Sequence, residues 1–460
     1  MYWANFLHFY QPPTQKKFWV DRITEESYRR VLKGLLDHPT ARVTLNINGV
    51  LLDLWEEYDH QDVIEMVKQL LDRGQIELTG SAKFHPLLPK IPKDEIKRQI
   101  ELNAETLKKY FGDYQPKGFF PPEMAYDSVV AKVAKEMGFS WIIAEELSYP
   151  ASAEASADRS GKVAYDRIYQ EQETGITIFF RERETSYKIL SGQLGTGKLF
   201  LEALGDRPGK NGYLLTAMDG ETFGHHRPGM DRALIELMTL PELSTVLISE
   251  LPEKFPQVEV VEPRPSTWAL MEKDLEKKLP FARWDDPENE IQQLQWELTD
   301  LAIATARNSN PSGSTGENGQ WGKAREMLDR AIHSDQYWWA SARPWWSLEM
   351  VERGAFELKE TVLAVPDVPE EVKEKARELY FGIITTGFAW QRSGKVEEIA
   401  KAEDEEVRMH TDAALGGLPK PEVEKMIAHI RQEMEEVAQK KEFERAAQLR
   451  DRIRELEEYL

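Results

Sequence analysis

The sequence predicts an α/β fold: a barrel of parallel strands, then a helical region, then a pair of C-terminal helices. Three observations indicate this. Short apolar runs alternate with helical patterns over the first part of the chain, the pattern beyond about residue 285 is helical, and the last segment carries two apolar seams. Strands that alternate with helices are typical of a parallel sheet, and about seven such units indicate closure into a barrel.

The predicted strands are short apolar runs bounded by polar residues. They are Tyr2–His8, Arg42–Asn46, Gln75–Thr79, Gly118–Phe120, Phe139–Ala144, Ile176–Phe180 and Tyr213–Met218. Amphipathic stretches lie between several of them, at Asp62–Arg73, Lys93–Phe111 and Val129–Met137. Each places its apolar side chains on one helical face. Pro92 precedes the second of these helices and Gly138 ends the third, in keeping with the residue preferences of helix ends.

Long stretches with a 3.6-residue period predict further helices at Glu290–Arg307, Gly322–His333 and Pro369–Phe388. The intervening segment Asn308–Gly319 is almost entirely Asn, Ser, Gly and Pro, which predicts a flexible loop or a lid. A charged stretch then leads to Gly416-Gly417-Leu418-Pro419, which we interpret as a hinge.

The C-terminal segment carries two series of apolar residues at intervals of three and four. They are Val423, Ile427, Ile430, Met434 and Val437 and, after a break near Lys440, Ala446, Leu449, Ile453, Leu456 and Leu460. Two such seams joined by a short turn predict an antiparallel helical hairpin, and a solvated helical tail without a partner is the alternative. We therefore expect three domains: a barrel over 1–284, a helical domain that completes the active-site cleft over 285–418, and a hairpin over 419–460.

Composition excludes several classes of function. The net charge of -21 argues against binding to nucleic acid, to anionic membrane surfaces and to polyanionic substrates. The absence of cysteine excludes disulfides, thiolate nucleophiles and cysteine-ligated metals. No apolar run approaches the roughly 18 residues that span a bilayer. The chain opens without a basic segment or a cleavage-site pattern, so we expect a cytoplasmic protein.

Carboxylates stand where the predicted strands end. The buried strand Tyr213–Met218 leads directly into Asp219, and two prolines stiffen the backbone just before Glu123. Barrel enzymes place their sites at the carboxyl ends of the strands, and glycoside cleavage needs two carboxylates that flank the bond. A closed barrel would bring Glu123 and Asp219 together. The alternative is that Glu123 caps the helix that follows it.

Five segments carry candidate chemistry, in the order His8–Pro12, Gly74–Ser81, Gly118–Tyr126, Tyr213–His226 and Ser334–Trp339, the last with Trp345 and Trp346 nearby. They resemble the five ordered motifs of glycoside hydrolase family 57, over about residues 1–350. The resemblance implies an incomplete (β/α)7 barrel followed by a helical region, retaining action on α-glucans, and no metal or other cofactor. It also implies that Glu123 is the nucleophile and Asp219 the acid/base.

Two positions depart from the family's motifs. Tyr10 stands where a second histidine is usual, and the tryptophan usual near Phe120 is absent. We expect these departures to affect specificity before catalytic competence.

Other motif residues are candidates for substrate binding: His8, Gln11, Glu77, His225, His226, Asp335, Trp338, Trp339 and Trp268. Polar side chains of this kind hydrogen-bond sugar hydroxyls, and indole rings stack on the faces of glucose units. The alternatives are that His8 is a satisfied core histidine and that some of the tryptophans belong to the core. Glu221 is expected to support the Asp219 loop.

The segment Glu442–Ile453 has a resemblance of its own, to the UVR hairpin. That module ends bacterial excision-repair proteins and also occurs on unrelated proteins, where it mediates protein–protein contact. The resemblance implies a docking or self-association module over about residues 422–458. It does not imply DNA repair, because no other feature of the chain supports it.

We therefore interpret the chain as a retaining hydrolase or transglycosidase of α-glucans or maltooligosaccharides, with a covalent glycosyl intermediate on Glu123. One alternative is a metal-dependent sugar deacetylase in which His225, His226 and Asp219 hold Zn²⁺. Another is a non-catalytic glucan-binding or scaffold protein whose hairpin recruits partners. The choices between hydrolysis and transfer, and between α-1,4 and α-1,6 bonds, stay open.

Overall fold

The computed structural model describes residues 1–150, 162–308, 320–343, 345–402 and 417–460. The predicted loop or lid at Asn308–Gly319 lies outside the described residues except for Asn308. Of the predicted hinge, Gly416-Gly417-Leu418-Pro419, the residue Gly416 lies outside the described residues. None of the helices in the described part of the chain is long and apolar enough to cross a membrane.

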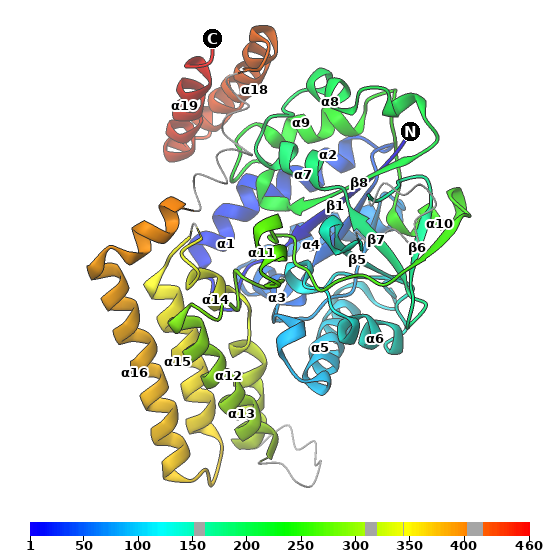
Figure 1. The fold of residues 1–460 in the computed structure, drawn as a ribbon. Coiled ribbons are helices and arrows are strands. Elements are labelled where there is room, and N and C mark those ends of the chain that lie inside the picture. Colours follow the sequence, from blue (N-terminus) through cyan, green and yellow to red (C-terminus); the bar gives the residue numbers. More distant parts are fainter. Residues whose placement is uncertain (151–161, 309–319, 344, 403–416) are drawn as a thin grey trace.

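The strands form two mostly parallel sheets (Figure 1). The first runs in the order β3 (Ile76–Leu78), β2 (Val43–Ile47), β1 (Tyr2–Phe9) and β8 (Tyr213–Asp219), with β9 (Ser244–Thr245) also paired to β1. The second runs in the order β10 (Val258–Val261), β6 (Ile168–Glu171), β7 (Thr177–Arg181), β5 (Trp141–Glu145) and β4 (Gly118–Phe119). The pair β6–β7 is antiparallel, and the other strand pairs of both sheets are parallel.

The two sheets are joined at both sides. A parallel bridge pairs Gly80, just after β3, with Phe119 of β4. On the other side the backbone N–H of Glu182, just after β7, donates to the carbonyl of Leu215 in β8 at 2.7 Å. Each predicted strand is present with its ends moved by at most two residues, and β6, β9 and β10 are additions.

A buried apolar cluster takes alternate residues from strands of both sheets. It includes Ala4, Phe6, Trp141, Ile143, Phe179, Leu215 and Ala217. The intervening residues, such as Trp3 and Leu7, belong to a second cluster that the surrounding helices share. Strands buried on both faces explain why these segments read as nearly continuous apolar runs.

Helices cover the outer faces of the sheets. They are α1 (Lys17–Ile23), α2 (Arg29–Asp37), α3 (Gly49–Glu57), α4 (Gln61–Asp72), α5 (Lys93–Phe111), α6 (Ser128–Glu136), α7 (Arg183–Leu190), α8 (Gly197–Leu204) and α9 (Met230–Met238). The three helices predicted in this part correspond to α4, α5 and α6. A π-helical turn, η1 (Thr24–Tyr28), joins α1 to α2.

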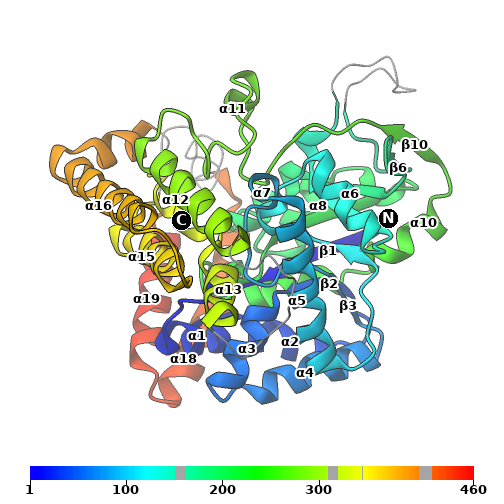
Figure 2. The same ribbon diagram turned by 90° about the horizontal axis from the view of Figure 1, so that it is seen from below.

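A group of longer helices lies to one side of the sheets (Figures 1 and 2). It consists of α12 (Glu290–Asn308), α13 (Gln320–Ala331), α15 (Leu348–Ala364) and α16 (Glu370–Ser393), with the short α11 (Glu272–Glu276) and α14 (Asp335–Trp339) on the connecting segments. The short α10 (Leu251–Lys254) lies between β9 and β10, away from this group. Three of these helices were predicted from their apolar period. Their buried residues continue into the core beneath α5 and α6.

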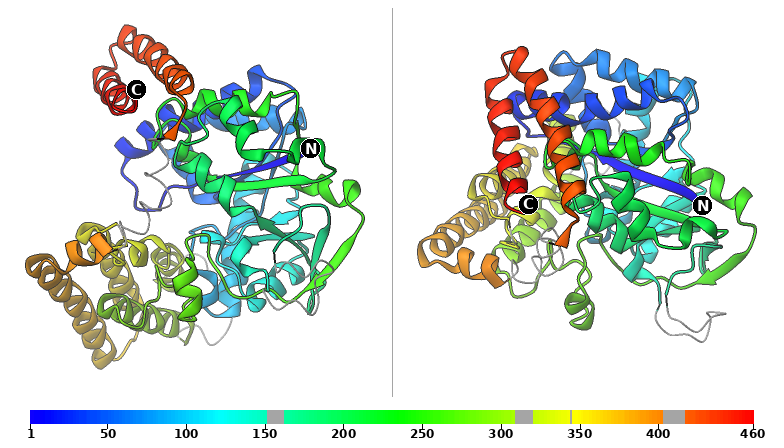
Figure 3. Two further views of the ribbon diagram at one scale, coloured as in Figure 1. Left: turned by 45° about the horizontal axis from the view of Figure 1, so that its top comes forward. Right: turned by 90° about the horizontal axis from the view of Figure 1, so that it is seen from above.

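The last two helices, α18 (Lys420–Gln439) and α19 (Phe443–Glu457), pack along each other at the edge of the molecule (Figure 3). Most of the predicted seam residues are buried, among them Val423, Ile430, Leu449 and Leu456. They pack into the same apolar cluster as the helices that cover the first sheet.

Candidate active site

Asp219 stands at the carboxyl end of β8, beside the end of β1. In the parallel register Asp219 lies opposite His8, and His8 lies opposite Asn46 of β2. Leu215 and Ala217 belong to the cluster enclosed by the sheets, so alternation along the strand directs Asp219 to the same side.

Glu123 lies after the end of β4, in a short 3-10 turn with φ of 60°. Such left-handed backbone is costly for a residue other than glycine, and it is frequent at functional sites. The indole N–H of Trp268 donates to Glu123 Oε2 at 3.0 Å, and the Ser334 hydroxyl donates to Oε1 at 3.2 Å. The helix α6 is capped by Asp127, whose side chain accepts from the Val130 N–H. Asp127 thus fills the capping role that the alternative interpretation gave to Glu123.

The two carboxyl groups have raised pKa values. Burial, with the charges of Asp335 and Asp219, raises the pKa of Glu123 to about 8. Burial also raises the pKa of Asp219 to about 6, although the positive charge of Arg181 opposes this. The side chain of Glu123 is still 15% exposed and that of Asp335 18%, so both can be reached from solvent.

A histidine pair connects the ends of β1 and β2 to Glu123. His8 Nδ1 lies 2.7 Å from Asn46 Oδ1, and His8 Nε2 lies 3.1 Å from His85 Nε2. His85 Nδ1 is 2.9 Å from the hydroxyl of Ser334, which donates to Glu123. Burial lowers the pKa of His85 to about 4 and also lowers that of His8, so both rings are neutral near pH 7.

Asp335, at the start of α14, is held by two partners. The Tyr10 hydroxyl donates to Asp335 Oδ2 at 2.5 Å, and His333 Nδ1 lies 3.0 Å from the same oxygen. Burial acts to raise the pKa of Asp335, but these two partners and the neighbouring histidines lower it overall. Tyr10 also stacks on His85 with ring centroids 3.9 Å apart. The residue that departs from the family's first motif is therefore part of the site.

The loop after Asp219 rests on the π-helical turn η1. The Ser27 hydroxyl donates to the Gly220 carbonyl at 2.7 Å, and the Tyr28 hydroxyl donates to Glu221. Gln11 Nε2 also donates to Glu221, at 3.0 Å, so Gln11 acts on this loop. Burial raises the pKa of Glu221 to about 8, and the charge of Asp219 adds to this. These contacts agree with the supporting role expected for Glu221.

His225 and His226 differ in their surroundings. His225 Nδ1 lies 2.6 Å from Glu26 Oε2, whereas the side chain of His226 is exposed. Among the described residues, no group of three or more His, Asp or Glu side chains is placed to hold a metal ion. These contacts give no support to the zinc ligands of the deacetylase alternative.

Glu77 lies apart from these groups. It accepts a hydrogen bond from the Thr44 hydroxyl at 2.8 Å and one from the backbone N–H of Ser249 at 3.1 Å. These contacts tie β2, β3 and the segment before α10 together. Substrate binding by Glu77 stays a prediction.

The predicted tryptophans fall into different environments. Trp268 contacts Glu123 directly, while Trp338 packs against Trp284 with ring centroids 5.1 Å apart. Trp339 packs on the core of the helical group. Of the two tryptophans further along, Trp345 is exposed, and the ring of Trp346 lies parallel to that of Trp390.

Sequence reasoning missed His85, His333 and Arg181 as site residues. His85 lies in a segment with no periodic pattern, and its partner Ser334 is 249 positions away. Arg181 ends β7, where it lies 3.4 Å from Glu145 and lowers the pKa of Asp219. The one available signal was the shared position of Arg181, Glu145 and Asp219 at predicted strand ends.

Known proteins resemble the two parts of the chain separately. The family model described as glycosyl hydrolase family 57 matches residues 6–263, and that of the UvrB/uvrC motif matches residues 424–459. An α-amylase of Pyrococcus horikoshii is 26% identical over 224 residues, which cover 48% of this chain and 34% of the relative. A 4-α-glucanotransferase of Thermococcus litoralis is 26% identical over 220 residues, which cover 47% and 32%. The chain thus spans about a third of the length of these relatives.

Solved structures share the fold. The GH57-type branching enzyme of Pyrococcus horikoshii superposes with a TM-score of 0.62 at 17% identity, over 84% of this chain and 96% of the other. The 4-α-glucanotransferase of Thermococcus litoralis gives a TM-score of 0.60 at 19% identity, over 79% and 59%. The family match covers more than half of the chain, and the fold agrees with it. The chain belongs to glycosyl hydrolase family 57.

Proposed function

We propose that this chain is an enzyme that cleaves or transfers α-glucans with retention of anomeric configuration. The observation that carries the proposal is the pair of buried carboxyl groups in a family 57 chain, Glu123 after β4 and Asp219 at the end of β8. They lie close enough for the charge of Asp219 to raise the pKa of Glu123. The names of the relatives, α-amylase and 4-α-glucanotransferase, support the substrate class.

The strands also suit the architecture that this family membership implies. The order β8-β1-β2-β3 continues through the Gly80–Phe119 bridge into β4-β5-β7, and the Glu182–Leu215 hydrogen bond returns to β8. We propose that these strands form an incomplete (β/α)7 barrel, followed by a helical domain and a C-terminal antiparallel hairpin. The carboxyl ends of the parallel strands then surround one site.

In the proposed mechanism Asp219 protonates the glycosidic oxygen while Glu123 attacks the anomeric carbon, and the glycosidic bond breaks. Asp219 then takes a proton from water or from an acceptor hydroxyl, which attacks the covalent intermediate and releases Glu123. The hydrogen bonds from Trp268 and Ser334 stabilise the ionised form of Glu123. His8, His85, Asp335 and Tyr10 are proposed to surround the bound sugar.

The pKa values of the pair predict a bell-shaped dependence of kcat/KM on pH. The reaction needs a single proton on the pair, and it needs that proton on Asp219. Because Glu123 has the higher pKa, the free site holds the proton mainly on Glu123, and it must move to Asp219 before the bond is cleaved. With pKa values of about 6 and about 8, the pair is doubly protonated below the first and fully ionised above the second. Activity should therefore be highest near pH 7, and fall about tenfold per pH unit below about pH 6 and above about pH 8. An optimum outside the range set by these two pKa values, measured on a maltooligosaccharide, would contradict the proposed proton count.

Substitution of Arg181 by methionine should move the acid limb of that profile to higher pH. The Arg181 charge lowers the pKa of Asp219, so its removal raises that pKa. We expect a shift of about half to one pH unit. Glu145 would keep its ion pair with Arg183 at 3.0 Å, which limits the cost to folding. An unchanged acid limb in R181M would show that Arg181 does not act on Asp219.

Incubation with maltooligosaccharides of defined length tests the proposed activity. Products both shorter and longer than the substrate would indicate transfer, and only shorter products would indicate hydrolysis. No change in chain length at any enzyme concentration, with a folded protein, would overturn the proposal.

Association with a protein partner through residues 422–458 stays a prediction. The seam residues that would bind such a partner, among them Ile427 and Ile453, are packed into the chain's own core.

A further inference from the structure

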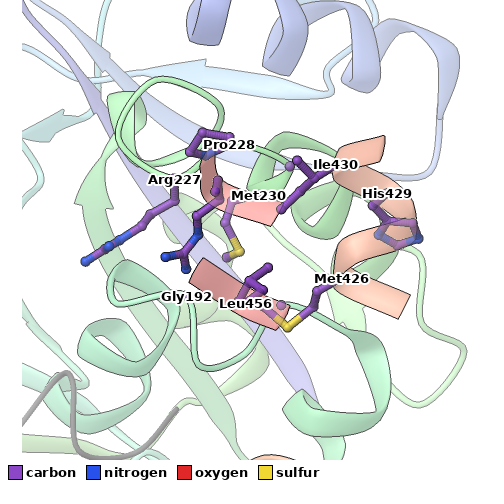
Figure 4. Close-up of a pocket in the computed structure, with 11 residues that line it drawn as sticks. Gly192, Arg227, Pro228, Met230, Met426, His429, Ile430 and Leu456 are labelled. Carbon is purple, nitrogen blue, oxygen red and sulfur yellow. The ribbon is translucent and has the colours of Figure 1, made fainter. Parts of the chain in front are cut away.

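The C-terminal helix pair α18–α19 is docked on the part of the chain that carries the Asp219 loop. The interface is shown in Figure 4, where Met426, Ile430 and Leu456 face Gly192 and Met230. Gly195 and Gly229 permit this approach. A Cβ added at Gly195 would lie 2.7 Å from Met426 Cε, and one added at Gly229 would lie 2.7 Å from Ile430 Cγ1.

Two polar contacts accompany this apolar packing, one buried and one exposed. The Thr196 hydroxyl donates to Glu422 at 2.6 Å, and Arg232 forms an ion pair with Glu436 at 2.9 Å. Exposed ion pairs of this kind contribute little to stability. The ion pair between Arg232 and Glu436 therefore does little to hold the helix pair in place. A buried arginine of α19 makes contacts of a different kind.

That arginine is Arg445, which is 5% exposed. Its Nη2 donates to the Gly224 carbonyl at 2.5 Å and to Glu433 Oε1 at 3.0 Å. Its Nη1 lies 3.6 Å from Glu26 Oε2. Arg445 thus joins the helix pair to the loop that follows Asp219 and to the π-helical turn on which this loop rests.

Gly224 lies tightly against that turn. Its φ is 113°, and a Cβ at this position would lie 2.0 Å from the carbonyl oxygen of Glu26. Glu26 in turn holds His225, at 2.6 Å. The loop is therefore held by η1 on one side and by Arg445 on the other.

We propose that Arg445 is a positioning residue for the Asp219 loop, and that docking of the C-terminal helix pair supplies it. The proposal rests on the proposed function, in which Asp219 is the acid/base. Without Arg445, the Gly224 carbonyl loses this hydrogen bond. Among the described residues, the fully buried Glu433 would keep its ion pair with Arg30, at 3.0 Å, as its one remaining ion pair. Buried polar groups that lose a partner destabilise the arrangement that buried them.

Hydrogen exchange read by mass spectrometry tests this in the full chain. In R445M, peptides that cover residues 219–229 should exchange at least about tenfold faster than in the unsubstituted protein. The value of kcat on a maltooligosaccharide should fall about 10- to 100-fold, while KM stays within about twofold, because alignment of the acid/base is lost and sugar contacts are kept. R445K, which keeps the charge, should recover part of both effects.

E436Q is the matched control. It removes an ion pair of the same interface that does not touch the loop, so exchange at 219–229 and kcat should both be unchanged. If R445M does not fold, R445K and E433Q take its place, and both should speed exchange in the same peptides.

The outcomes separate the two proposals. Unchanged exchange at 219–229 in R445M, or faster exchange with unchanged kcat, would overturn the positioning role. Faster exchange in R445M but not in E436Q, with no turnover of α-glucans by the unsubstituted protein, would show that Arg445 holds the loop while the proposed function fails.

Discussion

Replacement of Glu123 by glutamine is expected to reduce turnover of an α-glucan by a factor on the order of 10⁴ or more. The amide cannot form the covalent bond to the anomeric carbon, so the first chemical step is lost. Folding should be preserved, because glutamine has nearly the same shape: its carbonyl oxygen can accept from the Trp268 N–H, and its NH2 group can donate to the Ser334 hydroxyl. The raised pKa of Glu123 also means that its neutral form is already tolerated in the free site. Turnover is measured with a maltooligosaccharide, and folding by thermal melting.

The control for this experiment is Asp127→Asn, four residues after Glu123. Asp127 caps α6, and asparagine is an equally good cap, so both activity and melting temperature should be kept. A second measurement adds azide to Glu123→Gln with an activated substrate that has a good leaving group, and determines the anomeric configuration of the product. A small anion that takes the place of the missing carboxylate would give a product of inverted configuration. Near-normal turnover by Glu123→Gln would show that Glu123 is not the nucleophile.

Local periodicity explains how far the fold could be predicted. The helix predicted at Lys93–Phe111 coincides with α5, because its apolar side chains repeat at 3.6 residues and Pro92 marks its start. The strand predicted at Tyr213–Met218 is β8, which runs one residue further, to Asp219. The antiparallel β6 was missed because Ile168–Glu171 is short and alternates less clearly. How the two sheets join depends on backbone pairs such as Gly80–Phe119, which leave no mark in the local pattern.

The site was predicted to the extent that its residues stand in motifs at strand ends. Glu123 and Asp219 were proposed in this way, and their roles, like the support that Glu221 is expected to give the Asp219 loop, stay predictions. The structure instead places Gln11 on Glu221 and Glu77 on Thr44. Contacts between distant segments could not be predicted, because the Gly224 and Arg445 partners are 221 positions apart. Such a contact forms only when folding brings the two segments together, and neither segment carries a local pattern that indicates it.

Replacement of Asp219 by asparagine should lower turnover of a maltooligosaccharide by about 10³ to 10⁴, because sugar leaving groups need a proton from the acid. A substrate with a good leaving group, such as an α-glucosyl fluoride, needs no such proton. Its first step should therefore stay fast in Asp219→Asn, and the covalent intermediate on Glu123 should accumulate, since no base remains to activate water.

This accumulation gives a direct measurement. Mass spectrometry of Asp219→Asn after mixing with the fluoride should show one added glycosyl group, located by peptide mapping on Glu123. Azide needs no base, so it should release this group as a product of retained configuration, opposite to the outcome for Glu123→Gln. The matched variant Glu221→Gln keeps Asp219 and should neither accumulate the adduct nor respond to azide. An adduct on another residue, or an equal loss of activity on both kinds of substrate, would show that Asp219 does not serve as the acid/base.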